Sequence, residues 1–181
     1  LASSEQDLSA DPHVWLDPVL MQQIVHRIGD ALARADTAHA SADRQREGRT
    51  VRVLQRLDAA YRGGLASCRF TTFVTSHEAF GYLAQRYGLH QLGIEGLAPE
   101  SEPSAQRIQA AATAIQQGRA APAVFYEETA EGRRVGQSVA ADVGVPALPL
   151  GTVATVPTPG DYLSVMRENL SSLEQGLRCA S

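Results

Sequence analysis

Lysine is absent from this sequence of 181 residues, and the chain has only two cysteines and one tryptophan. All 16 basic residues are therefore arginine, and the formal net charge of −4 argues against the broad basic surface of a nucleic-acid-binding domain. No apolar run approaches the roughly 20 residues that span a bilayer. A hydrophobic fraction of 44% with 20% charged residues is typical of a globular protein.

The common short signatures of catalysis and nucleotide binding are also missing. The sequence has no CxxC, GxGxxG, Walker A, GxSxG or HExxH pattern, so the usual signals for zinc ribbons, dinucleotides, nucleotide phosphates, serine hydrolases and zinc peptidases do not apply. The chain opens without a methionine, a basic stretch or an apolar stretch. We therefore expect any export signal to be absent or already removed.

The two cysteines each lie beside a predicted element. Cys68 comes just before a strand, and Cys179 lies at the end of the last helix. Export to an oxidising compartment would favour a disulfide between them. Such a bond would close a long loop and contribute about 4 to 5 kcal/mol in the chain-entropy model. Two unrelated thiols are the alternative.

The first part of the chain predicts helices that have no sheet of their own. Residues 1–12 are polar and indicate a loop, and Asp17-Pro18 predicts the start of a helix. A second, longer helix is predicted over residues 42–65. Its apolar stripe is narrow, which is typical of a helix packed along one side only. We therefore expect a strut between lobes.

From Arg69 onward, strands and helices alternate. Short apolar strands are predicted over residues 70–75, 90–94, 123–126 and 145–150. Helices are predicted between and after them, over residues 76–88 with Ser76 as N-cap, 104–118, 129–143 and 161–178. This alternation predicts an α/β fold with a four-stranded parallel sheet flanked by helices.

Polar side chains gather at the carboxyl ends of the predicted strands, where open α/β sheets bind ligands. His77 follows the first strand at a strand-to-helix turn, and a surface histidine is the alternative interpretation. His13 lies in the rigid segment DPHVWLDP beside the only tryptophan. A histidine and several carboxylates on one rim suit a metal site or an acid/base site. The rim carboxylates are Glu95, Glu100, Glu102, Glu127 and Glu128. For Glu95, Glu100, Glu128 and Glu131, a solvated acidic loop with helix caps is the favoured interpretation. The other three histidines, His26, His39 and His90, are expected to be structural or exposed.

Five segments together resemble the metal-binding receptors of zinc and manganese ABC importers, the ZnuA/TroA-like substrate-binding proteins. They are DPHVWLDP, FVTSHEAFGYLAQRYGL, GLAPESEPS, VFYEE and GDYLSVMRENL. They occur in the family's order and cover nearly the whole chain. The resemblance implies two α/β lobes joined by a long rigid helix, with one metal ion held between the lobes.

On this resemblance, residues 1–41 are a remnant of an N-terminal lobe. Residues 42–66 are the helix between the lobes, and residues 67–181 are the C-terminal α/β lobe. The resemblance also implies a periplasmic or extracellular receptor, compatible with a lipid anchor, that is not an enzyme. It would deliver its metal to the membrane permease of an ABC importer.

Ligand positions carry over from the family residue by residue. The histidine of its D-P-H-x-W motif is His13, and the histidine of its T-S-H motif is His77. Another histidine ligand of the family lies on an N-terminal segment that this chain does not contain. The family's late carboxylate position is occupied by Leu148, so water or Glu127 would fill it, or Glu127 would orient an imidazole.

Imidazole donors favour Zn²⁺, and the shortage of carboxylate oxygens makes Mn²⁺ a less suitable cargo. Two other functions stay open on the residues alone. One is a zinc-dependent hydrolase that uses His13, His77 and a rim glutamate as base. The other is an adhesin or partner-binding fragment without a competent metal site.

Overall fold

A computed structural model describes residues 11–97, 104–154 and 160–180. Its centre is a four-stranded sheet in the order β2-β1-β3-β4, in which every neighbouring pair is parallel. The strands are β1 (Thr72–Thr75), β2 (His90–Gly93), β3 (Val124–Tyr126) and β4 (Ala147–Pro149). The expected α/β class with a parallel sheet is confirmed.

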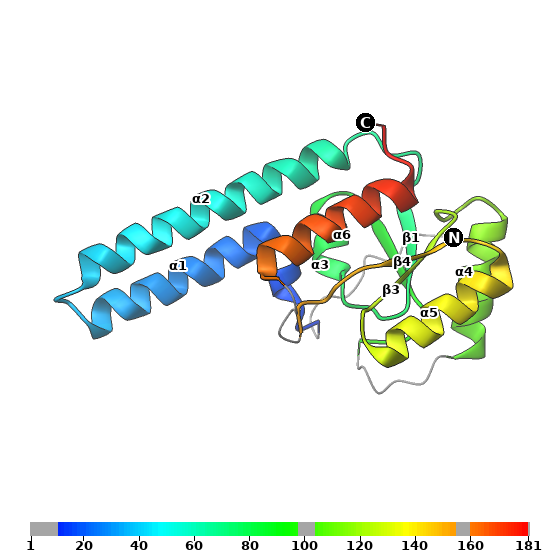
Figure 1. Ribbon diagram of the computed structural model, residues 1–181, viewed down its shortest axis with the longest axis horizontal. Helices are drawn as coiled ribbons and strands as arrows, with labels where there is room; N and C mark the ends of the chain where they lie inside the picture. Colours follow the sequence, from blue (N-terminus) through cyan, green and yellow to red (C-terminus); the bar gives the residue numbers. More distant parts are fainter. Residues whose placement is uncertain (1–10, 98–103, 155–159, 181) are drawn as a thin grey trace.

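Side chains alternate along the central strands and form two hydrophobic cores. Phe73 and Phe125 point to one face, where helices α3 (Gly81–Arg86) and α6 (Tyr162–Leu177) pack. Val74 and Val124 point to the other face, under helices α4 (Ala105–Gln116) and α5 (Ala130–Val143). Both faces of the sheet are therefore covered (Figure 1), as the continuous apolar strands require.

Helices α1 (Pro18–Ala35) and α2 (Ala40–Gly64) form a hairpin that projects from the sheet domain (Figure 1). Asp17 caps α1 by accepting from the N–H groups of Val19 and Leu20, as the Asp-Pro pair predicts. At the root of the hairpin, the fully buried Tyr61 donates its hydroxyl to the Met166 carbonyl at 2.7 Å. This contact joins α2 to α6. No helix in the described ranges is long and apolar enough to cross a membrane.

The predicted helix over residues 76–88 is wrong in its first turn. Helix α3 begins only at Gly81, and Phe80 rather than Ser76 precedes it. Ser76 instead continues the sheet, because its N–H donates to the Phe125 carbonyl at 2.8 Å and its hydroxyl accepts from the Glu127 N–H at 3.1 Å. A residue bound to β3 in this way cannot cap a helix, so residues 77–80 form an irregular segment.

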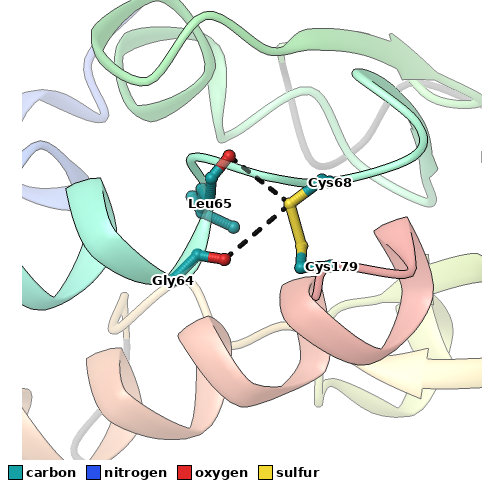
Figure 2. Close-up of a disulfide and its surroundings, with 4 residues drawn as sticks. All are labelled: Gly64, Leu65, Cys68 and Cys179. Atoms are coloured by element: carbon teal, nitrogen blue, oxygen red, sulfur yellow. Dashed lines mark hydrogen bonds between the residues drawn. A yellow bond between two sulfur atoms is a disulfide. The ribbon is translucent and has the colours of Figure 1, made fainter. Parts of the chain in front are cut away.

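A disulfide joins Cys68 to Cys179 and ties the segment after α2 to the end of α6 (Figure 2). The Cys68 Sγ atom lies 3.4 Å from the Leu65 carbonyl oxygen. Backbone hydrogen bonds lie on either side of the disulfide, and one of them runs from the Phe70 N–H to the Leu177 carbonyl at 3.1 Å. The two ends of the sheet domain are therefore fastened together.

Removing this disulfide should destabilise the fold. The bond closes a loop between residues 111 positions apart, and the unfolded chain gains that freedom in a Cys68→Ser/Cys179→Ser variant. We expect the free energy of unfolding in urea to fall by about 4 kcal/mol. Dithiothreitol should lower the stability of the unmodified chain equally and leave the variant unchanged. Equal stability of variant and parent would contradict this account.

Two helical glycines should respond in opposite ways to alanine. A Cβ on Gly176 would lie 2.4 Å from Phe125 Cζ and 3.1 Å from Leu148 Cδ1, so Gly176→Ala should cost about 1 to 3 kcal/mol of unfolding free energy. A Cβ on the exposed Gly63 meets nothing within 4 Å. Gly63→Ala should therefore be neutral or stabilise by about 0.5 to 1 kcal/mol. Thermal unfolding of both variants measures the contrast.

Candidate metal centre

His13 and His77 lie against each other although they are far apart in the sequence. Their ring centroids are 5.2 Å apart, and the rings meet edge to face at 79°. His13 immediately precedes the short 3-10 helix η1 (Val14–Leu16), and His77 follows β1 at the carboxyl edge of the sheet. Both residues are buried, with 7% and 3% of their surface exposed. The structure thus brings together the two histidines that the sequence singled out.

Three contacts hold residues 11–17, the His13 segment, against the α/β part of the chain that contains the sheet. The Trp15 indole N–H donates to the Thr152 carbonyl at 2.8 Å, and the Tyr162 hydroxyl donates to the Trp15 carbonyl at 2.8 Å. The Arg86 guanidinium pairs with the buried Asp17 carboxylate at 2.8 Å. These contacts reach the turn after β4, the start of α6 and helix α3. They fix where His13 can lie.

Asp11 orients the His13 ring. Its Oδ1 accepts from the His13 backbone N–H at 2.9 Å and lies 2.7 Å from His13 Nδ1. A carboxylate at this nitrogen places the imidazole proton on Nδ1, which leaves the Nε2 lone pair free to bind a metal. The sequence analysis missed Asp11. Its signal was an aspartate two residues before a histidine, a spacing at which Asp side chains bond the backbone ahead of them.

His77 keeps an unused ring nitrogen in the interior. Its Nδ1 is buried and has no hydrogen-bond partner among the described residues. Burial lowers the pKa of His77, against the opposing effects of the Glu127 carboxylate and the Gly96 backbone. A lowered pKa favours the neutral imidazole, which is the form that binds metal. A buried nitrogen without a partner costs stability and would be satisfied by a ligand.

The spacing of the two rings suits one shared metal ion. Imidazoles bound at 2.0 to 2.1 Å to a tetrahedral Zn²⁺ have ring centroids about 5 Å apart. The observed separation of 5.2 Å agrees with this value. The described residues contain no group of three or more His, Cys, Asp or Glu side chains arranged to hold a metal. His13 and His77 are therefore a pair of donors and not a complete tetrahedral set.

Glutamates follow β2 and β3 at the carboxyl edge of the sheet, as the strand-end rule predicts, and the charge of Glu127 acts on the His77 ring. Glu127 follows β3 and is half-buried, and its Oε1 accepts a hydrogen bond from the Thr152 hydroxyl. Glu95 is buried, and its pKa is raised by burial and by the charges of Glu131 and Glu127. Glu128 lies in a surface ion pair with Arg133. The predicted rim residues Glu100 and Glu102 lie outside the described residues.

Leu148 takes no part in this centre. It lies in β4, and its side chain packs in the same core cluster as Phe125 on the α6 face of the sheet. An aspartate in its place would bury a carboxylate among apolar side chains. Leu148 therefore supplies no ligand and belongs to the core, and the correspondence of its position with the family's carboxylate stays a prediction.

The remaining histidines are exposed. The His26 ring pairs with Glu47 at 2.6 Å and is 55% exposed, and the His39 ring pairs with Asp36 at 2.8 Å and is 73% exposed. His90 is exposed on β2. All three agree with the expectation of structural or surface roles.

Comparison with known proteins shows the family to which this chain belongs. A family model described as "Zinc-uptake complex component A periplasmic" matches residues 2–176. The chain is 34% identical to the zinc-binding protein AdcA of Streptococcus pyogenes, over 90% of this chain and 32% of AdcA. It is 32% identical to the high-affinity zinc uptake system protein ZnuA of Bacillus subtilis, over 92% of this chain and 53% of ZnuA. The chain thus spans about a third to a half of these relatives.

Solved structures agree with the sequence matches. The Zn(II)-bound ZnuA-like domain of Streptococcus pneumoniae AdcA superposes with a TM-score of 0.78 at 32% identity, over 95% of this chain and 66% of that domain. The laminin-binding protein Lmb of Streptococcus agalactiae, described as an adhesin with metal-transporting activity, superposes with a TM-score of 0.85 at 31% identity. That match covers 92% of this chain and 65% of Lmb.

The Arg86–Asp17 ion pair should matter more to stability than a surface pair. The Asp17 side chain is 2% exposed, so Arg86→Met leaves a buried carboxylate with only its helix-cap hydrogen bonds. We expect a loss of about 2 to 3 kcal/mol in unfolding free energy. The control is Arg62→Met, which breaks the more exposed pair with Asp58 and should cost much less, because solvent screens that pair. Equal losses in urea unfolding would show that Asp17 does not anchor the segment.

Proposed function

The chain belongs to the ZnuA family of periplasmic zinc-uptake components, and on that premise we propose that it binds Zn²⁺ through His13 and His77 as the receptor of an ABC importer. The observation that carries the proposal is the pairing of the two buried rings at 5.2 Å. Asp11 leaves one ring nitrogen of His13 free, and the buried Nδ1 of His77 has no other partner in the described chain.

Zinc is the proposed cargo because the donors are mainly imidazoles. Zn²⁺ accepts nitrogen ligands in a tetrahedral arrangement, whereas Mn²⁺ favours a larger set of oxygen ligands. Among the carboxylates, Glu127 has the largest effect on the pKa of His77, because its negative charge favours the protonated ring. The described residues hold no third donor placed for the metal, so Glu127 orients an imidazole through water, or becomes a third ligand only after its side chain moves on binding.

An incomplete ligand set suits a carrier that must release its cargo. In this proposal the remaining coordination positions are taken by water or by donors from a further lobe, and the metal leaves by ligand exchange. The site lies between the His13 segment and the carboxyl edge of the sheet, which corresponds to the cleft between lobes. The permease of the importer would receive the ion there.

The proposed location is extracytoplasmic. A disulfide such as Cys68–Cys179 persists in oxidising compartments. A similar protein, from Streptococcus pneumoniae, is a zinc-binding lipoprotein. We therefore place this chain in the periplasm or at the cell surface, held there by a lipid anchor or free.

Zinc titration of untagged protein in a calorimeter tests the proposal. We expect one Zn²⁺ per chain with micromolar or weaker affinity, because two imidazoles and one carboxylate form a small donor set. His13→Ala and His77→Ala should each weaken binding at least about tenfold, which corresponds to ~1.4 kcal/mol. His90→Ala, at an exposed histidine, is the matched control and should bind as the parent does.

Several results would contradict the proposal. Unchanged zinc affinity in His77→Ala would place the metal elsewhere, and tighter binding of Mn²⁺ than of Zn²⁺ would overturn the choice of cargo. Submicromolar zinc affinity of the monomer would contradict an incomplete ligand set. Zinc-dependent hydrolysis of ester or peptide substrates that disappears in His77→Ala would favour a hydrolase.

Adhesion is the second candidate, and the likeness to laminin-binding Lmb favours it. A His13→Ala/His77→Ala double variant separates the two functions. Adhesion without a competent metal site predicts that this variant still binds immobilised laminin in surface plasmon resonance. The metal-receptor proposal predicts that the double variant loses zinc binding while its fold remains intact by circular dichroism.

A further inference from the structure

Thr152 is bonded both to the segment that carries His13 and to Glu127, which follows β3. Its carbonyl accepts the indole N–H of Trp15 at 2.8 Å, and Trp15 belongs to the segment that carries His13. Its hydroxyl donates to Glu127 Oε1, and the charge of Glu127 acts on His77. The Glu127 backbone N–H also donates to the Ser76 hydroxyl at 3.1 Å, directly before His77. Thr152, which is 4% exposed, is therefore bonded to the segment that carries His13 and to a residue that is itself bonded beside His77.

The turn that carries Thr152 is held in place by α6. The buried Asn169 accepts from the Gly151 N–H and donates to the Gly151 carbonyl, both at 2.7 Å. These two bonds fix the peptide groups just before Thr152. The backbone at Thr152 is thus oriented from the core of the domain.

The next residue adopts a strained conformation. Val153 has φ +55°, in the left-handed region that β-branched residues rarely occupy. Such a conformation costs free energy and persists only where surrounding contacts over-determine it. The strained residue directly follows the residue that is bonded to Trp15 and Glu127.

We propose that Thr152 is a positioning residue of the metal centre. Its hydroxyl holds the Glu127 carboxylate in one orientation, and its carbonyl holds the His13 segment against His77. The inference rests on the proposed zinc site, and it adds a residue that binds no metal itself. Groups of this kind typically change metal affinity by about 10- to 100-fold when they are removed.

Thr152→Val tests the proposal because valine keeps the shape of threonine and lacks the hydroxyl. Zinc affinity should fall about tenfold in competition with a chromophoric chelator. The visible absorption bands of bound Co²⁺, which report ligand geometry, should shift. Thr152→Ser should restore both properties, because serine returns the hydroxyl donor. Thr113→Val, which removes an exposed threonine hydroxyl in α4, is the matched control and should behave as the parent does.

The partner of the hydroxyl can be identified with a double-mutant cycle. In a Glu127→Ala background, Thr152→Val should cause no further loss of zinc affinity, because the bond is already absent. An equal loss in both backgrounds overturns the proposal. So does a Thr152→Val protein that keeps the cobalt spectrum and zinc affinity of the parent, even if its stability falls. A Thr152→Ser protein as defective as Thr152→Val overturns it as well.

A metal-free measurement separates this inference from the zinc proposal. The indole N–H of Trp15, the only tryptophan, gives one NMR signal whose position and exchange rate report its bond to Thr152. In the parent chain without metal this indole signal should be protected from exchange, and an unprotected indole contradicts the proposed hold on the His13 segment. Thr152→Val keeps the backbone carbonyl and should leave the signal protected. If the parent chain binds neither Zn²⁺ nor Co²⁺, the zinc proposal fails and this signal alone decides the positioning of the segment.

Discussion

The candidate centre depends on the docking of one short segment, residues 11–17, onto the sheet domain. Trp15 supplies the central contact, since its indole N–H and its backbone carbonyl are both bonded to the domain, to Thr152 and Tyr162 respectively. Asp17 adds a buried ion pair and at the same time starts α1. Without these contacts His13 would have no fixed relation to His77, because nothing local in the chain connects them.

The sheet positions the other half of the centre. Parallel strands deliver their following residues to one edge, and Ser76 extends this order by bonding β3 through both its backbone and its hydroxyl. His77 is therefore presented at the edge by a segment that is still attached to the sheet. The delayed start of α3 and the position of His77 at the edge have the same physical cause.

The centre combines features that would be costly without a ligand. They are a buried imidazole nitrogen with no partner among the described residues, a buried Glu95 and a strained Val153. Costs of this kind concentrate at functional sites, where surrounding contacts compensate for them. Here the compensation comes from the two hydrophobic cores, the Asn169 bonds to Gly151 and the Cys68–Cys179 disulfide.

The sequence by itself determined the features that depend on local periodicity and capping. These include the α/β class, the parallel order of short apolar strands, and the start of α1 at Asp17-Pro18. Their positions at a strand end and in a rigid loop made His77 and His13 candidates, and the motif resemblance added their role as metal ligands. Only the tertiary structure decided that these rings meet, that Leu148 faces the core, that Ser76 binds β3, and that Asp11 and Thr152 orient the site. Each of these outcomes depends on which of several possible partners, often distant in the sequence, a side chain contacts in the fold. The pattern of residues along one chain does not specify that choice.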